Sequence, residues 1–201
     1  MNLFLKLSTS IDGLNRFIGR HAIWLILISV FISAINAVVR KAFSMSSNAY
    51  LEIQWYLFAG TFLLMAAYTL LNGEHVKIDV VYGRWSKRTQ MWIDVFGFIF
   101  FLLPFAGVTL FFSVPFFWQG FISGEMSSNA GGLIRWPVYL LMPVGFFLLF
   151  IQGLSELIKR IAFLRGLIED PTVKAGEKSA EAELAAAIQR LAEEKAASSK
   201  A

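Results

Sequence analysis

Four long apolar stretches without a charged residue divide the chain. They are Ala22–Val39, Ile53–Gly73, Val95–Gly124 and Trp136–Ser155. Each reaches the roughly 17–25 residues that a helix needs to cross the hydrocarbon core of a bilayer. Because backbone groups in lipid must bond within their own segment, these stretches predict helices rather than open strands. The pattern therefore predicts an all-α integral membrane protein with four transmembrane helices.

Two further segments flank this four-helix region. In Asn2–Arg20, apolar residues recur at helical spacing, which favours an N-terminal interfacial helix on the cytoplasmic leaflet. Gly13 and Gly19 offer places to turn, and the alternative is a helical extension of the first span with no separate role. Ala180–Ala197 is rich in Ala, Glu and Lys, which predicts a C-terminal helical tail in the cytoplasm. A solvated, partly frayed helix is favoured over a partner-binding tail because its apolar stripe is thin. The expected parts are 1–21, 22–165 and 166–201.

The third apolar stretch contains two prolines, Pro104 and Pro115. Each proline removes a backbone hydrogen bond from a helix interior. We therefore expect a kink or a break in this span.

Basic residues are distributed unevenly between the two sides that these spans define. Up to Arg165, ten lie on the side of the termini and of the loop between the second and third spans, and three lie on the other side. The positive-inside bias then places both termini in the cytoplasm. The net charge of +4 is thereby assigned to topology and not to nucleic-acid binding. The first span is too long for a typical signal peptide and is expected to remain as an anchor.

The chain has little material for catalysis or cofactor binding. It contains no Cys, so disulfides and thiolate metal sites are excluded. Both histidines, His21 and His75, lie at span boundaries, where they cannot hold a haem inside the membrane. His75 and Asp79 are one helical turn apart, but no nucleophile accompanies them, so a structural anchor is expected. We expect no enzyme activity, no metal and no cofactor.

The middle of every span is uncharged. Intramembrane charges usually mark ion paths and proton relays. Small residues such as Gly60 instead allow close helix packing. The residues therefore indicate a scaffold that buries one or more faces against a larger membrane protein.

Three short motifs in a fixed order resemble the small, DctQ-type membrane subunit of tripartite TRAP transporters. Asn36 and Arg40 end the first span, Glu52 opens the second, and His75 is followed by an apolar-x-apolar-Asp run that ends at Asp79. The resemblance covers roughly residues 13–165. One departure is that Glu52 is followed by Ile53, whereas the family often has paired acids there.

This resemblance implies a role in secondary transport across the bacterial inner membrane. An extracytoplasmic substrate-binding protein would deliver an organic acid to a large, DctM-type subunit, which holds the sodium and substrate sites. The small subunit would brace the static scaffold of that large subunit. Two alternatives stay open: an independent small transporter or channel, and an accessory subunit of another membrane complex.

The sequence also provides candidate contact residues. Arg40 and Glu52 are expected to act at the outer face, with each other or with the partner. Ordered phospholipid is expected between the small and large subunits, since cytoplasmic basic residues attract anionic headgroups. The candidates for a structural or partner-interface role are Asn36, Arg40, Glu52, Trp55, Gly60, His75 and Asp79, and the headgroup candidates are Arg84, Lys87, Arg88, Lys159 and Arg160.

Overall fold

The computed structural model describes residues 2–45, 47–74 and 84–172, and its regular structure is helical. Four helical runs are long and apolar enough to cross a membrane, which confirms the predicted fold class. The third run, Lys87–Ser123, combines three consecutive elements. The elements are α1 (Asn2–Phe43), α2 (Asn48–Leu71), α4 (Lys87–Gly97), the π-helical turn η1 (Phe98–Leu102), α5 (Leu103–Ser123) and α6 (Trp136–Leu164).

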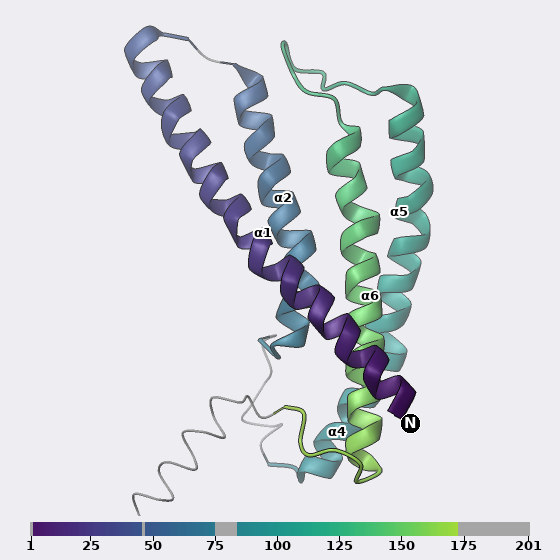
Figure 1. Cartoon of the computed structure of the whole chain (residues 1–201). Coiled ribbons are helices and arrows are strands. Elements are labelled where there is room, and N and C mark those ends of the chain that lie inside the picture. Colours follow the sequence, from purple (N-terminus) through teal and green to yellow (C-terminus); the bar gives the residue numbers. More distant parts are fainter. Residues whose placement is uncertain (1, 46, 75–83, 173–201) are drawn as a thin grey trace, which may run out of the picture.

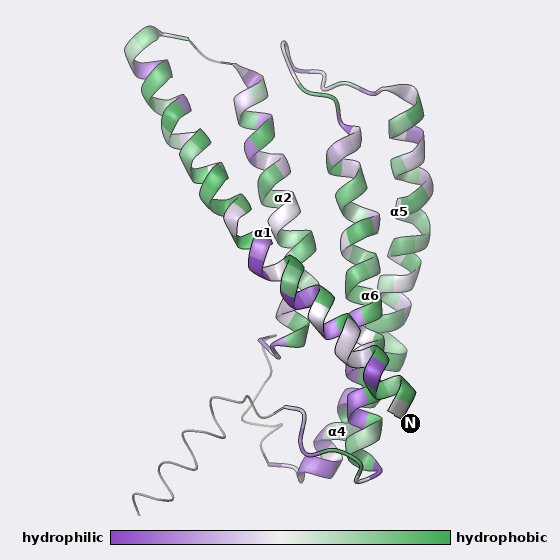
Figure 2. Cartoon of the chain, in the orientation of Figure 1, coloured by the Kyte–Doolittle hydropathy of each residue, from purple (hydrophilic) through white to green (hydrophobic). Residues whose placement is uncertain are grey.

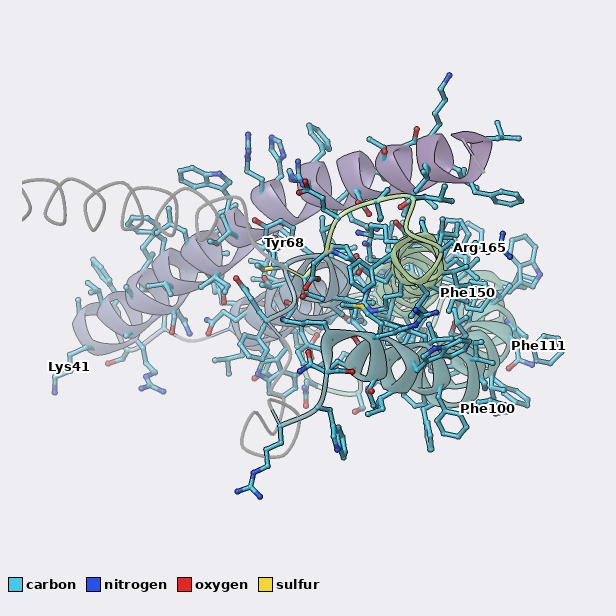
Figure 3. All side chains as sticks on the ribbon, turned by 90° about the horizontal axis from the view of Figure 1, so that it is seen from below. Lys41, Tyr68, Phe100, Phe111, Phe150 and Arg165 are labelled. Carbon is cyan, nitrogen blue, oxygen red and sulfur yellow. The ribbon has the colours of Figure 1, made fainter. Side chains whose placement is uncertain are left out.

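Helix α6 is the central element of the fold. It packs against α1, α2, α4, η1 and α5. Helix α1 crosses α2 and α6 on one side, and the run from α4 to α5 lies along the other side of α6 (Figures 1 and 3). We call the end that holds the N-terminus of α1, α4 and the C-terminus of α6 the basal end. The opposite end, with the connections 44–47 and 124–135, is the loop end.

Helix α1 continues without interruption from Asn2 to Phe43. A separate interfacial helix with a turn at Gly13 or Gly19 is therefore not what the structure shows, and the extension of the first span describes it better. Gly19 serves a close contact instead, because a Cβ there would lie 2.3 Å from Cγ of Tyr68 on α2. This extension also has contacts of its own, since its polar side chains bond to α6.

The third span is not broken at its prolines. The π-helical turn η1 ends two residues before Pro104, and Pro115 lies inside α5. A π-helical turn shifts backbone bonding from i−4 to i−5, and such turns commonly occur as single insertions in α-helices. The turn therefore changes the local bonding pattern just where Pro104 offers no N–H donor.

Glycines bring the helices close together inside the protein. A Cβ on Gly60 would contact Leu25 of α1 and Leu141 of α6 at 3.4 and 3.5 Å. A Cβ on Gly107 would lie 3.4 Å from the ring of Phe150. In Figure 3 Phe150 lies among the helices, whereas Phe100 and Phe111 point away from them. Gly60 thus allows close packing within the chain, and a contact with a partner stays a prediction.

We predict that Gly145→Ala destabilises the protein by about 1–3 kcal/mol, the usual cost of overpacking. The added methyl would lie 2.8 Å from both Cβ and the carbonyl oxygen of Leu63, and the backbone of α2 cannot move without shifting the helix. Thermal unfolding in detergent, followed by tryptophan fluorescence, measures the effect. Gly13→Ala is the control, because its methyl meets no atom within 4 Å. Equal unfolding temperatures for the two variants would contradict the packing described for α2 and α6.

Large apolar side chains cover most of the outer surface of the spans. Phe58 and Phe62 on α2 and Phe111 on α5 are among the many that are exposed. Figure 2 shows apolar residues along all four spans and hydrophilic residues concentrated in the N-terminal half of α1, in α4 and in the last turns of α6. This surface requires lipid or a partner protein around it.

Candidate functional site

A cluster of polar side chains joins three helices at the basal end. Most of these residues are buried, including Asn15, Gln152 and Ser155. Residues spaced three and four apart share one side of a helix, which explains how α6 alone supplies five members. We call the set the basal polar cluster; it consists of Ser8, Asp12 and Asn15 from α1, Asp94 from α4, and Gln152, Ser155, Glu156, Lys159 and Arg160 from α6.

One half of the basal polar cluster joins α1 to α6 by hydrogen bonds. The hydroxyl groups of Ser8 and Ser155 are 2.7 Å apart, and the Ser155 hydroxyl donates to Oδ1 of Asp12 over 2.7 Å. Nδ2 of Asn15 donates to Oε1 of Gln152 over 2.7 Å. Nε2 of Gln152 in turn donates to Asp12 over 2.9 Å. These bonds hold the N-terminal part of α1 against α6 in a defined register.

The other half of the cluster is ionic. Nζ of Lys159 lies 2.9 Å from Oδ2 of Asp12 and also pairs with Glu156. Nε of Arg160 donates to Oδ2 of Asp94 over 2.9 Å, and its Nη1 pairs with Glu156. The guanidinium carbon of Arg160 lies 4.7 Å from the centre of the Phe98 ring. Arg160 is only 6% exposed, so its charge depends on these partners in place of water.

The cluster can position helices, but its carboxylates already pair with Lys159 and Arg160, which disfavours a bound metal ion. Lys159 and Arg160 already lie between the three carboxylates of Asp12, Asp94 and Glu156. Among the described residues no group of three His, Cys, Asp or Glu side chains could hold a metal. The arrangement therefore ties α1 and α4 to α6 and favours a rigid base.

Glu52 organises the loop end. It is 4% exposed, and its carboxylate accepts a hydrogen bond from the backbone N–H of Leu133 over 2.7 Å. Asn129 donates its side-chain amide to Glu52 over 2.8 Å, and the hydroxyl of Ser127 donates to the same carboxylate. One side chain at the start of α2 thus fixes three points of the connection between α5 and α6.

This connection, residues 124–135, has a defined shape of its own. Met126 and Ile134 form an antiparallel bridge, and Gly131 adopts a positive φ of 69°. The guanidinium of Arg135 lies 2.8 Å from Oε1 of Glu125. The pKa of Arg135 is raised above its usual value, mainly by the neighbouring phenol of Tyr139 and to a smaller extent by Glu125. The Arg135 guanidinium therefore stays charged. The loop end is therefore a compact polar cap on α2 and α6.

The candidate contact residues fall into different environments. Glu52 bonds to the 124–135 connection of its own chain, while Arg40 is exposed in the last turn of α1. Trp55 is exposed on α2, and Asn36 is half-buried on α1. His75 and Asp79 lie outside the described residues.

The basic headgroup candidates also divide into two groups. Arg84, Lys87 and Arg88 are exposed near the start of α4, and Lys87 lies 3.5 Å from Asp170. Lys159 and Arg160 form ion pairs with carboxylates of the same chain. In the sequence, Glu156 and Asp94 are simply charged residues next to the ends of uncharged stretches. The Gln152–Arg160 spacing on one side of α6 was the signal that could have indicated a buried polar network.

An apolar groove of about 720 Å³ lies next to the basal polar cluster. Ala66 and Leu70 of α2 form one wall, and Phe98 and Phe101 of η1 form the other. Leu149 of α6 also lines it, and Asp94 and Arg160 are its charged lining residues. Its apolar lining suits hydrocarbon, either of lipid or of a partner side chain.

Residues 23–163 match the protein family described as tripartite ATP-independent periplasmic transporters, DctQ component. No match was found among curated proteins or among solved structures. The matched segment contains α2, α4, η1 and α5 in full, part of α1, nearly all of α6, and the 124–135 connection that Glu52 holds. Ser8, Asp12 and Asn15 of the basal polar cluster lie before it. The family is one of transporter subunits and not of enzymes. The chain therefore belongs to the DctQ family, the small membrane component of TRAP transporters.

Proposed function

We propose that this chain is a static scaffold that braces the large, DctM-type subunit of a TRAP transporter. That subunit would import an organic acid in a sodium-coupled reaction, after an extracytoplasmic binding protein delivers it. The match to the DctQ family over residues 23–163 is the observation that carries this proposal. The structure supports it with two polar groups that lock opposite ends, one around Arg160 and the other around Glu52.

We place the basal end in the cytoplasm of a bacterial inner membrane. Exposed basic residues there, such as Lys6, Arg84 and Arg88, agree with the positive-inside bias. The loop end would then face the binding protein. Arg40 and Trp55 are exposed at this end and remain candidates for contact with the large subunit or the binding protein.

We also propose that phospholipid occupies part of the junction between the small and large subunits. The apolar groove beside Leu70 and Phe98 can take acyl chains, and Arg84, Lys87 and Arg88 lie near the start of the helix that lines it. Native mass spectrometry of the purified complex should detect retained phospholipid. Complexes that are equally stable after complete lipid removal would refute a structural lipid.

The scaffold role predicts that the chain alone transports nothing. Proteoliposomes that contain only this chain should show no sodium-driven uptake from a panel of carboxylates, since the middle of each span is uncharged. Proteoliposomes with the large subunit and the binding protein added should show uptake. Transport by the chain alone would instead establish an independent transporter.

A further inference from the structure

The N-terminal arm, residues Asn2–Arg20 of α1, turns its polar side chains toward the protein. Ser8 and Asn15 are buried, and both bond to α6. Asp12 reaches Lys159 on the same side. Successive residues of an α-helix are about 100° apart around its axis, so Ser8, Asp12 and Asn15 fall within one narrow sector. All three side chains of this sector hydrogen-bond or ion-pair with α6.

A second sector of the arm is apolar and exposed. It contains Leu3, Leu7, Leu14 and Phe17, all of which are exposed. The same side of the unbroken helix continues into the first span with exposed Ile28 and Ile35. Polar residues inside and apolar residues outside are the reverse of the pattern expected for a helix on a water-facing surface.

A third sector, beside the apolar one, is basic. Lys6, Arg16 and Arg20 are exposed there. The single acidic residue of the arm, Asp12, lies in the inward sector, where Lys159 neutralises it. The exposed surface of the arm therefore combines an apolar stripe with positive charge that pairs with no carboxylate of the described residues.

We propose that the arm is a lipid-contacting element whose apolar sector is buried at the headgroup–acyl boundary and whose basic sector binds anionic phospholipid headgroups. Membrane-surface helices have this combination of an apolar face and flanking Lys and Arg. The structure adds what the sequence pattern lacks: the side that faces lipid is the one with Leu7 and Leu14, because Asn15 and Ser8 fix the opposite side on α6.

Two observations favour lipid over a protein partner as the occupant of this surface. The apolar sector is continuous with the outer side of the first span, where Ile28 and Ile35 are exposed. The basic sector complements anionic headgroups, which attract juxtamembrane Lys and Arg at the membrane surface. The arm thereby sets the depth of α1 in the bilayer, and the basal polar cluster transmits that position to α6.

Site-directed spin labelling tests this orientation directly. The chain has no Cys, so Leu7→Cys, Leu14→Cys, Thr9→Cys and Gly13→Cys each carry one nitroxide. The full chain with its co-purifying partners is placed in nanodiscs of phosphatidylcholine with phosphatidylglycerol. Oxygen and a water-soluble nickel chelate then report access from lipid and from water.

Labels at positions 7 and 14 should be more accessible to oxygen than labels at positions 9 and 13. Labels at positions 9 and 13 should be more accessible to the nickel chelate than labels at positions 7 and 14. Equal nickel access at all four positions would overturn the proposal by placing the arm in water. Shielding of positions 7 and 14 from both reagents would overturn it in favour of a protein partner. Unfolding temperatures equal to that of the unlabelled protein verify that each label leaves the fold intact.

A charge variant tests the anionic headgroups separately. Replacing Lys6, Arg16 and Arg20 together by Gln should move the label at position 14 toward water in nanodiscs that contain phosphatidylglycerol. In nanodiscs of phosphatidylcholine alone, the label at position 14 should lie at the same depth with and without the triple replacement. The matched control replaces Arg40 and Lys41 at the loop end by Gln and should leave the label at position 14 unmoved. An unchanged depth with the triple replacement in both lipid compositions would refute headgroup binding.

Discussion

Arg160→Met should be the most damaging single substitution in the described part of the chain, with an expected loss of about 3–5 kcal/mol of folding stability. Arg160 is 6% exposed and pairs with both Asp94 and Glu156. Methionine fills similar space but takes the guanidinium away from the buried carboxylate of Glu156 and the partly buried carboxylate of Asp94. Thermal unfolding in detergent and the amount of protein in the membrane measure the loss.

Two further variants separate charge from packing. Arg165→Met removes an exposed arginine just after α6 and should have little effect. Adding Glu156→Gln to Arg160→Met restores the original net charge of the basal polar cluster, so part of the lost stability should return. If Arg160→Met and Arg165→Met unfold alike, the cluster does not stabilise the basal end.

Glu52→Gln should release the connection between α5 and α6 while the spans stay folded. The neutral side chain presents one acceptor oxygen in place of two, although Leu133, Ser127 and Asn129 all donate to this site. Losing one hydrogen bond to a charged group corresponds to about a tenfold or larger increase in local opening. Amide hydrogen exchange across residues 125–135 should rise by that factor, with little change in α6.

Glu125→Gln is the matched control for this experiment. It removes an acidic residue from the same connection, but its partner Arg135 is partly exposed and solvated. Such pairs contribute little to stability, so exchange across the connection should stay nearly unchanged. Similar exchange in the two variants would show that Glu52 does not hold the loop end.

The elements of the fold could be predicted because hydrocarbon imposes a simple rule on the sequence. Uncharged runs such as Ile53–Gly73 and Trp136–Ser155 must be helical in a bilayer, and they are long enough to cross its hydrocarbon core. The continuity of α1 could not be predicted in this way. Whether Gly19 turns or packs depends on Tyr68, a residue almost fifty positions later in the chain.

The contacts of the site residues were harder to predict. Glu52 lies at the loop end near the start of α2, and its partners come from the 124–135 connection, a pairing that the sequence did not indicate. Lys159 was a headgroup candidate because it follows the fourth span, and the sequence did not indicate its pairing with Asp12. Pairing between distant residues depends on helix rotation, which hydropathy alone does not determine.

These contacts explain how a small membrane protein can remain rigid without a site in the middle of its spans. The basal polar cluster fixes α1 and α4 on α6, and Glu52 fixes the opposite end. Between them, Gly60 and Gly145 allow close apolar packing. The large apolar outer surface then remains for lipid and for a partner.

The composition of the complex isolated from native membranes tests the scaffold role most directly. The tagged chain is purified in mild detergent, and native mass spectrometry gives the mass and the stoichiometry of the intact particle. Our account predicts one copy of this chain bound to one copy of a large, many-spanning TRAP subunit. Recovery of this chain only as a homo-oligomer, with no large subunit bound, would contradict it.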